Sequence, residues 1–182
     1  MKLRLFIAIP IEKSLADKLD SWNQQNSSPK LRLTKKENLH ITVLFLGYVE
    51  EENLVEIKNK LLEISRSTKN FDLSIEQNNL APPQGTKRMV WTYFQESREF
   101  KELADKVYQA LGKYSREKVH REALPHITLA RSKETLKKED SISDTGNFRG
   151  EVIKINSLIL FRSQPSKSGS KYSFLAGLLL KD

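Results

Sequence analysis

The tetrapeptide His-Ile-Thr followed by an aliphatic residue occurs twice in this chain, and this repeat strongly constrains the fold. The two copies begin at His40 and His126, which are two of only three histidines in the sequence. Each copy lies in a run rich in aliphatic and β-branched residues, which is typical of a strand. Alternate side chains of a strand point to the same face. The repeat therefore predicts one strand that presents His40 with Thr42 and another that presents His126 with Thr128.

The order of apolar patterns along the chain predicts an α+β fold. Helices are expected over 14–25, 51–66 and 98–113, where apolar residues recur at helical spacing. Strands are expected over 2–10, 31–34, 39–46, 71–77, 88–94, 126–131, 151–161 and 172–180. The first motif strand is expected to stop at Gly47. Hairpin-like connections within 71–94 and 151–180 favour antiparallel sheets over a parallel, doubly wound arrangement.

The two motif strands each lie downstream of a long amphipathic helix, and this shared order predicts two pseudo-symmetric lobes in one domain, 1–182. Two antiparallel sheets facing each other, with helices on the outside, would bring both motif strands to a central groove. Two polar segments are expected to be loops. They are 141–150 and 163–171, of which the second is expected to form a rim because it contains Pro165 and Gly169.

The composition narrows the class of partner and the compartment. The net charge of +8 favours a polyanionic partner, although a lysine-rich solvated surface explains the charge equally well. There is no cysteine, so disulfides and a thiol nucleophile are excluded. No apolar run reaches membrane-spanning length, and the N-terminal segment is interpreted as a strand rather than a signal peptide. We expect a cytoplasmic protein with no membrane association and no obligate protein partner.

Two imidazoles that face one groove can act as a proton donor and a proton acceptor near neutral pH. With a phosphodiester between them, one imidazole would take a proton from water and the other would protonate the departing oxygen. The hydroxyls of Thr42 and Thr128 would donate hydrogen bonds to the non-bridging phosphate oxygens. This chemistry suits a strained cyclic phosphate and requires neither a metal nor another cofactor.

Other kinds of catalytic site are less well supported by the sequence. A metal site normally requires a third ligand, and the histidine faces of the motif strands offer threonine rather than carboxylate. The sequence contains no GxSxG element of a serine hydrolase. It also contains no GxxxxGK[ST] or GxGxxG element for binding a nucleotide phosphate.

Arg131 is a further candidate for binding phosphate, because a guanidinium matches the geometry of a phosphate group. Simple alternation places Arg131 on the opposite face of its strand from His126 and Thr128. It can therefore join them only if the strand ends or bulges at Ala130.

The aromatic residues near the motifs have a structural and a functional interpretation. Phe45 is predicted to lie in the core with Ile41 and Val43. Trp91 and Phe6 would be able to stack on a nucleotide base, a common contact in RNA recognition. Core packing is the favoured interpretation for both.

The remaining basic residues and the third histidine are weaker candidates. Several lysines and arginines would be able to steer RNA, although each alone is expected to be a solvated charge: Lys87, Arg88, Arg162, Lys167 and Lys171. His120 lies in a polar turn and is expected to have no catalytic role.

The paired motifs and their flanks resemble the 2H phosphoesterase superfamily, and within it the RNA 2′,3′-cyclic phosphodiesterases, also called 2′-5′ RNA ligases. The resemblance extends over nearly the whole chain. Its segments are 4–9, the first signature 37–47, 88–91, the second signature 125–131, and the closing residues Ser163, Gly169 and Tyr172. The segment 31–36 departs from the family, which often has a tryptophan there, and it leaves the substrate preference open.

The resemblance implies a bilobal α+β fold with a central groove. It also implies metal-independent hydrolysis of RNA 2′,3′-cyclic phosphate ends to 2′-phosphate ends. By this analogy His40 donates a proton to the departing 3′ oxygen and His126 activates water, although the residues alone do not distinguish the two roles. Two alternatives remain. One is the reverse joining of RNA ends through a 2′-5′ linkage, and the other is a non-catalytic nucleotide- or RNA-binding module.

Overall fold

The computed structural model describes residues 1–115, 123–137, 148–166 and 169–182. The strands in these residues are β1 (Lys2–Pro10), β2 (Leu31–Leu33), β3 (His40–Glu50), β4 (Phe71–Ala81), β5 (Met89–Phe94), β6 (His126–Ser132), β7 (Val152–Ile155), β8 (Ser157–Ser166) and β9 (Gly169–Leu179). The α-helices are α1 (Lys13–Gln25), α2 (Leu54–Arg66) and α3 (Arg98–Leu111). The predicted α+β class is confirmed. The predictions for His120, Lys167 and most of 141–150 lie outside the described residues.

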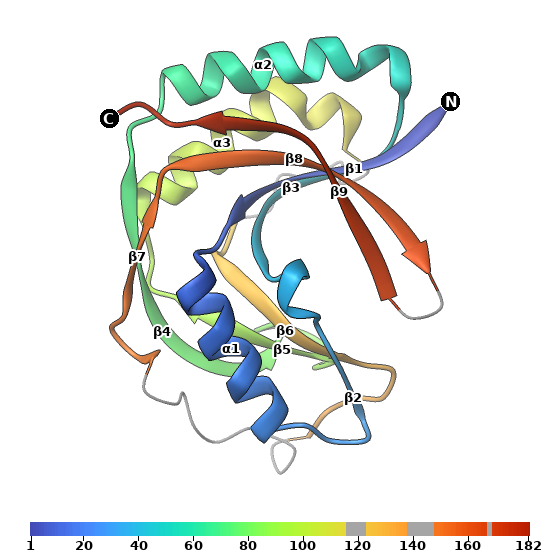
Figure 1. The fold of residues 1–182 in the computed structure, drawn as a ribbon, viewed down its shortest axis with the longest axis vertical. Coiled ribbons are helices and arrows are strands. Elements are labelled where there is room, and N and C mark those ends of the chain that lie inside the picture. The colour runs from blue at the N-terminus through green and yellow to red at the C-terminus, as the bar shows by residue number, and fades with distance from the viewer. Residues whose placement is uncertain (116–122, 138–147, 167–168) are drawn as a thin grey trace.

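The strands form one curled sheet in the order β7-β4-β5-β6-β3-β1-β8-β9, with β2 paired to β6. All pairings between these strands are antiparallel, as predicted. The sheet has two halves, β7-β4-β5-β6 and β3-β1-β8-β9, which follow different directions in Figure 1. They are joined at the centre through the residue pair Ile41 and Ile127. The two predicted sheets are therefore continuous through the second residue of each motif.

The helices pack on both halves of the sheet (Figure 1). α2 and α3 lie side by side along the β3-β1-β8-β9 half, whereas α1 crosses the other half near β6. α3 buries an apolar stripe that includes Phe100, Leu103 and Val107, a spacing that fits one face of a helix. No helix in the described ranges is long and apolar enough to span a membrane.

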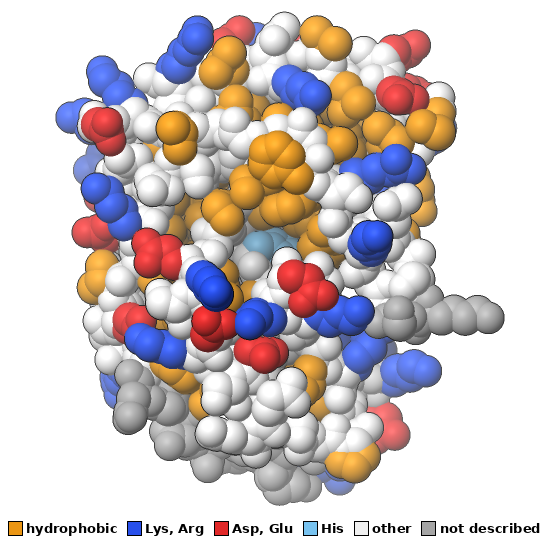
Figure 2. Space-filling view, in the orientation of Figure 1, with side chains coloured by type: hydrophobic (Ala, Val, Ile, Leu, Met, Phe, Trp, Pro, Cys, Tyr) orange, Lys and Arg blue, Asp and Glu red, His pale blue; other side chains and the backbone are white. Residues whose placement is uncertain are grey.

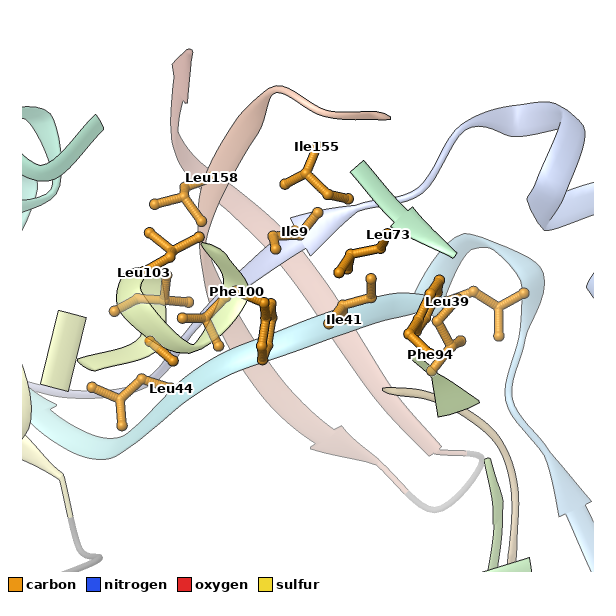
Figure 3. Packing of buried hydrophobic residues seen from close by; sticks show 14 of the residues in the cluster. Ile9, Leu39, Ile41, Leu44, Leu73, Phe94, Phe100, Leu103, Ile155 and Leu158 are labelled. Atoms are coloured by element: carbon orange, nitrogen blue, oxygen red, sulfur yellow. The ribbon is translucent and has the colours of Figure 1, made fainter. Parts of the chain in front are cut away.

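A continuous cluster of buried side chains passes through both halves of the sheet. Figure 3 shows Ile41 between Phe100 of α3 on one side and Leu73 and Phe94 on the other. Ile41 and Ile127 are both fully buried. Because strand side chains alternate between faces, burial of these two isoleucines turns the histidine and threonine on either side of each toward the opposite face.

Two predicted strand boundaries were wrong. β3 does not stop at Gly47 but continues to Glu50, because Gly47 has a φ of 79° and lies beside a bulge opposite β1. Glycine adopts this backbone conformation without the steric cost that a Cβ imposes. The predicted single strand 151–161 is divided at Asn156, since β7 pairs with β4 while β8 pairs with β1.

The predicted rim loop 163–171 was also largely wrong. β8 and β9 form a long hairpin in which Pro165 pairs with Ser170. The pairing of β8 with β1 ends at Arg162 opposite Leu5, so Pro165 lies where β8 has a partner on one side only. A proline is tolerated there because its missing N–H interrupts no second ladder.

Candidate active site

The four polar residues of the two motifs meet where the halves of the sheet join. Antiparallel geometry around the Ile41–Ile127 pair sets His40 opposite Thr128 and Thr42 opposite His126. The same grouping appears in the cavities of the groove. One cavity is lined by His40, Thr42 and Thr128, and the adjoining one by Thr42 and His126.

Both imidazoles are oriented by the same kind of backbone contact. Nδ1 of His40 lies 2.6 Å from the carbonyl oxygen of Asn38, and Nδ1 of His126 lies 2.8 Å from that of Leu124. A carbonyl oxygen only accepts hydrogen bonds, so each Nδ1 carries a proton and donates it. In a neutral imidazole this leaves the lone pair on Nε2. Nε2 of His40 lies 3.0 Å from Oγ1 of Thr42.

Aromatic rings pack against both imidazoles. The ring of His126 stacks on Trp91 with 3.6 Å between ring centroids and 16° between ring planes. His40 contacts Phe6 at 5.0 Å and Tyr172 at 5.4 Å between centroids. The predicted core position of Trp91 was wrong, because this half-buried side chain lines the groove. Phe6 is buried but packs against His40 rather than in the main cluster.

The enclosed position of the imidazoles favours their neutral forms. The pKa of His126 is lowered to about 4, mainly by burial and also by the charges of His40 and Arg131, while its hydrogen bond to the carbonyl oxygen of Leu124 opposes this shift. Burial also lowers the pKa of His40 from its ordinary value, and its bond to Asn38 opposes this effect. The charge of His40 thus contributes to the lowered pKa of His126, as expected for two imidazoles that face one groove.

A bulge in β3 changes which residues face the groove. β1 pairs with Thr42 and with Leu44 but skips Val43, which adds one residue to that side of the ladder. Both Val43 and Leu44 are buried, and Phe45 then joins His40 and Thr42 on the groove face. The prediction that Phe45 lies in the core was therefore wrong.

A second bulge, in β6, has the same effect on Arg131. β5 pairs with Thr128 and with Ala130 but skips Leu129. The extra residue returns Arg131 to the groove face, where it lines the same cavity as His40 and Thr128. The bulge lies at Leu129, one residue before the position that simple alternation required.

This second bulge is stabilised from outside the strand. The carbonyl oxygen of Leu129 accepts one hydrogen bond from Nδ2 of Asn23 at 3.0 Å and another from the backbone N–H of Thr34 at 2.8 Å. Asn23 belongs to α1 and is only 2% exposed. A helix that takes no part in the groove thus stabilises the backbone that presents Arg131.

The two cavities of the groove differ in chemistry. The cavity beside His126, about 650 Å³, is mainly apolar and aromatic, and its lining includes Phe45, Trp91, Tyr108, Pro82, Pro83 and Leu124. The cavity beside His40, about 400 Å³, is polar, and its lining includes Arg4, Arg32, Arg131, Asn38, Ser163, Ser170 and Tyr172. Figure 2 shows one face of the molecule, in which a histidine is recessed near the middle, between a group of hydrophobic side chains and a row of charged ones.

Of the basic residues predicted to steer RNA, one fastens a turn beside the groove and three lie outside its two cavities. Lys87 Nζ donates to the carbonyl oxygens of Pro82 and Pro83 and so fastens the turn that borders the apolar cavity. Arg88, Arg162 and Lys171 line neither of the two cavities.

Sequence reasoning missed two arginines of the polar cavity. Arg4 lies two residues before Phe6 on β1, so strand alternation alone was a usable signal for their shared face. Arg32 lies on the short strand β2, and nothing in the sequence indicates that β2 pairs with β6 beside the second motif. Within the described residues, no group of three His, Cys, Asp or Glu side chains is placed to hold a metal ion.

Comparison with known proteins connects this groove to a family. Residues 9–91 match the family model described as LigT-like phosphoesterase. A Methanocaldococcus jannaschii protein named RNA 2′,3′-cyclic phosphodiesterase is 32% identical over 184 residues, covering 95% of this chain and 98% of its own length. A protein of the same name from Archaeoglobus fulgidus is 34% identical over 134 residues, covering 72% of this chain and 73% of its own. The crystal structure of E. coli LigT complexed with 3′-AMP has a TM-score of 0.83 at 23% identity, covering 100% of both chains.

Proposed function

The chain belongs to the LigT-like phosphoesterase family, and we propose that it hydrolyses the 2′,3′-cyclic phosphate at an RNA end to a 2′-phosphate. Two relatives at 32% and 34% identity carry the name RNA 2′,3′-cyclic phosphodiesterase. The observation that carries the proposal is the meeting of two imidazoles, each fixed through Nδ1, with two threonine hydroxyls in one groove. The proposed substrates are RNAs or nucleotides that end in a cyclic phosphate, and the proposed location is the cytoplasm.

In the proposed reaction the cyclic phosphate lies between the two imidazoles. Nε2 of His126 accepts a proton from a water molecule as the water oxygen bonds to phosphorus. The bond from phosphorus to O3′ breaks, and Nε2–H of His40 donates its proton to O3′. The phosphate remains on O2′. The hydroxyls of Thr42 and Thr128 donate to the non-bridging oxygens, and Arg131 balances their negative charge.

The assignment of the two roles rests on the family resemblance, because the groove lowers the pKa of both imidazoles. A pKa of about 4 keeps His126 neutral near neutral pH, as a proton acceptor must be. His40 has to be protonated to act as the donor, and burial and the charge of Arg131 both oppose this by lowering its pKa. The negative charge of a bound phosphodiester raises the pKa of a facing imidazole, so substrate binding supplies the missing stabilisation.

The apolar cavity is the proposed site of the terminal base. Its aromatic residues Phe45, Trp91 and Tyr108 offer faces and edges for stacking. Stacking on aromatic side chains is largely tolerant of base identity, because every base has a π face. We therefore expect weak discrimination between bases.

The test is to incubate the protein with adenosine 2′,3′-cyclic phosphate after exhaustive chelation and to identify the product by chromatography. Adenosine 2′-phosphate is the expected product, with no loss of rate on chelation. Loss of activity that returns on adding zinc or manganese would contradict the two-histidine mechanism. A 3′-phosphate product would contradict the identity of the departing oxygen.

Joining of RNA ends through a 2′-5′ linkage is the alternative that the same site supports. Joining a cyclic phosphate end to a 5′-hydroxyl RNA end uses the same two proton transfers, with the 5′-hydroxyl in place of water: its proton passes to His126, its oxygen bonds to phosphorus, and O3′ leaves with a proton from His40. Adding a 5′-hydroxyl RNA to the assay and looking for a 2′-5′ linked product distinguishes it from hydrolysis. Binding of the cyclic nucleotide without either product would instead indicate a non-catalytic binding module.

A further inference from the structure

The cavity beside His40 has more positive charge than the proposed reaction uses. Three arginines line it, Arg4 from β1, Arg32 from β2 and Arg131 from β6. Among the described residues, none of those that line it is an aspartate or a glutamate. The reacting phosphate accounts for Arg131, which shares the cavity with Thr128, but it leaves Arg4 and Arg32 without a role.

These charges are not neutralised within the described part of the chain. None of the ion pairs there includes any of the three arginines. Arg4 is half-buried, donates from Nη1 to Oγ of Ser163 at 3.0 Å, and lies over the ring of Phe45 at 4.7 Å. These contacts fix its guanidinium but leave its charge unbalanced.

The three guanidiniums are close enough to repel one another. Desolvation lowers the pKa of Arg131 most; the nearby Tyr172 opposes this, and the charges of Arg32 and Arg4 lower the pKa further. A protein that gathers like charges in a cavity loses stability through their repulsion unless an anion relieves it. The cavity is therefore complementary to a second anionic group beside the reacting phosphate.

The positive surface continues outward from this cavity. A smaller neighbouring cavity shares Arg32, Arg131 and Tyr172 with it and adds the exposed Lys35. A chain that leaves the reacting centre by this path would pass Arg32 before it reaches Lys35.

We propose that Arg4 and Arg32 bind a second phosphate of the substrate, the 5′-phosphate of the nucleotide that carries the cyclic phosphate. In RNA this group is the phosphodiester that connects the terminal nucleotide to the rest of the chain. It is separated from the reacting phosphate by a single ribose, which fits one contiguous polar cavity. The inference rests on the proposed function and adds a specificity to it: the site selects RNA ends over nucleosides that carry only the cyclic phosphate.

The test compares two substrates, adenosine 2′,3′-cyclic phosphate with a 5′-hydroxyl and the same compound with a 5′-phosphate. A charge-assisted contact of this kind corresponds to roughly tenfold or more in kcat/KM. Wild-type protein should therefore prefer the 5′-phosphorylated substrate by at least about tenfold. Arg32→Gln should lose most of that preference, because its kcat/KM should fall far more for the 5′-phosphorylated substrate than for the 5′-hydroxyl substrate.

Two further variants make the comparison specific. Arg4→Gln should reduce the same preference, and Arg32, being exposed, gives a variant that keeps the test valid if Arg4→Gln fails to fold. Arg66→Gln is the matched control, because Arg66 is exposed at the end of α2 and its loss changes the net charge equally. If Arg66→Gln lowers the preference as much as Arg32→Gln does, general electrostatic attraction explains the effect and the subsite is excluded.

Binding of unreactive nucleotides separates this inference from the proposed reaction. Calorimetry should show that adenosine 2′,5′-bisphosphate binds roughly tenfold more tightly than adenosine 2′-phosphate, and that Arg32→Gln removes the difference. If neither cyclic substrate is hydrolysed but this difference is found, the proposed reaction fails and the second-phosphate site stands. Equal affinity of wild-type protein for the two nucleotides, or a preference that survives in both arginine variants, overturns the site.

Discussion

The two motif histidines have matching backbone contacts but different neighbours. Nδ1 of each donates to the carbonyl oxygen two residues earlier in the chain. His126 then stacks face to face on Trp91, while His40 meets Tyr172 edge-on and has Thr42 at Nε2. The repeated local contact aims both Nε2 atoms, and the different neighbours allow the two imidazoles to take different protonation states.

Replacing either histidine should remove most of the activity. His40→Ala and His126→Ala should each lower kcat by about 10²–10⁴-fold, because each removes one proton transfer. The double variant should be little slower than either single variant, since the two groups act as a unit. Steady-state kinetics with the cyclic nucleotide measures this. His120→Ala is the matched control, and a loss there as large as that of His40→Ala would mean that the site is misassigned.

The threonines should matter less than the histidines. Thr42→Val and Thr128→Val would each remove one of the proposed hydrogen bonds to the phosphate and keep the side-chain shape, so kcat/KM should fall by roughly ten- to a hundredfold. The same kinetic assay measures this. A loss equal to that of the histidine variants would show that a threonine takes part in proton transfer.

The rate should depend on pH as a bell whose maximum lies on the acid side of the ordinary histidine pKa of 6.5. The active form has one neutral and one protonated imidazole, and burial lowers both pKa values, that of His126 to about 4. The limbs of kcat should lie at higher pH than those of kcat/KM, because the bound phosphate favours protonation. The two apparent pKa values that set these limbs belong to the coupled pair of imidazoles and not to either histidine alone. A rate that keeps rising into the alkaline range would exclude a protonated histidine donor.

Stability should fall as the pH is lowered from 6.5 towards about 4. In this range the unfolded chain binds a proton at His126, whereas the folded chain does not, so protonation favours unfolding. Above 6.5 both states are neutral and the contribution of the buried neutral imidazole is complete. Urea unfolding across this range measures the slope. His126→Gln should lose less stability than wild type, and an unchanged slope would contradict the lowered pKa.

Among the structural elements, the motif strands owe their functional faces to bulges as well as to alternation. The bulge at Val43 brings Phe45 to the groove, and the bulge at Leu129 brings Arg131 there. The second bulge is held by Asn23 of α1, which contacts it through the buried side-chain amide. The placement of a candidate phosphate ligand thus depends on a helix on the other side of the sheet.

Asn23→Ala should weaken the protein and its activity together. The change leaves the carbonyl of Leu129 with the N–H of Thr34 as its remaining partner, and loss of a buried hydrogen bond costs about 1–3 kcal/mol. Urea unfolding measures the loss. At temperatures where the variant stays folded, kcat/KM should also fall, because Arg131 is no longer held on the groove face. Gln24→Ala, an exposed neighbour on the same helix, is the control, and equal effects of the two changes would contradict the role of Asn23.

On the scale of the whole molecule, the two halves of the sheet share a core although they meet at one residue pair. Ile41 and Ile127 are fully buried at that junction, and the cluster around them includes side chains of both halves. We propose on this basis that the chain folds as a single domain.

Unfolding should therefore be one cooperative transition. The two tryptophans, Trp22 on α1 and Trp91 on β5, report on one half, whereas far-UV circular dichroism is dominated by helices that include α2 and α3 on the other. Both signals should have the same urea midpoint. Ile41→Ala should shift both midpoints equally, by a loss of about 2–5 kcal/mol. Separate midpoints would show that the halves are independent domains.

The sequence by itself determined the features that depend on neighbouring residues. Apolar periodicity located the helices and most of the strands, and the repeated His-x-Thr pattern identified the four side chains that meet in the groove. Simple alternation predicted the wrong face for Phe45, and it placed Arg131 on the groove face only with a bulge. The sequence did not reveal the bulges at Val43 and Leu129, because a bulge depends on the register with a partner strand distant in the chain.

Tertiary structure alone decided the gathering of Arg4 and Arg32 beside His40, the division of 151–161 between the two halves, and the pairing of 163–166 with 169–172. It also decided the lowered pKa values of the histidines. The physical reason is the same in each case. Burial, charge and strand pairing are set by residues far apart in the sequence, and local periodicity does not indicate which distant segments come together.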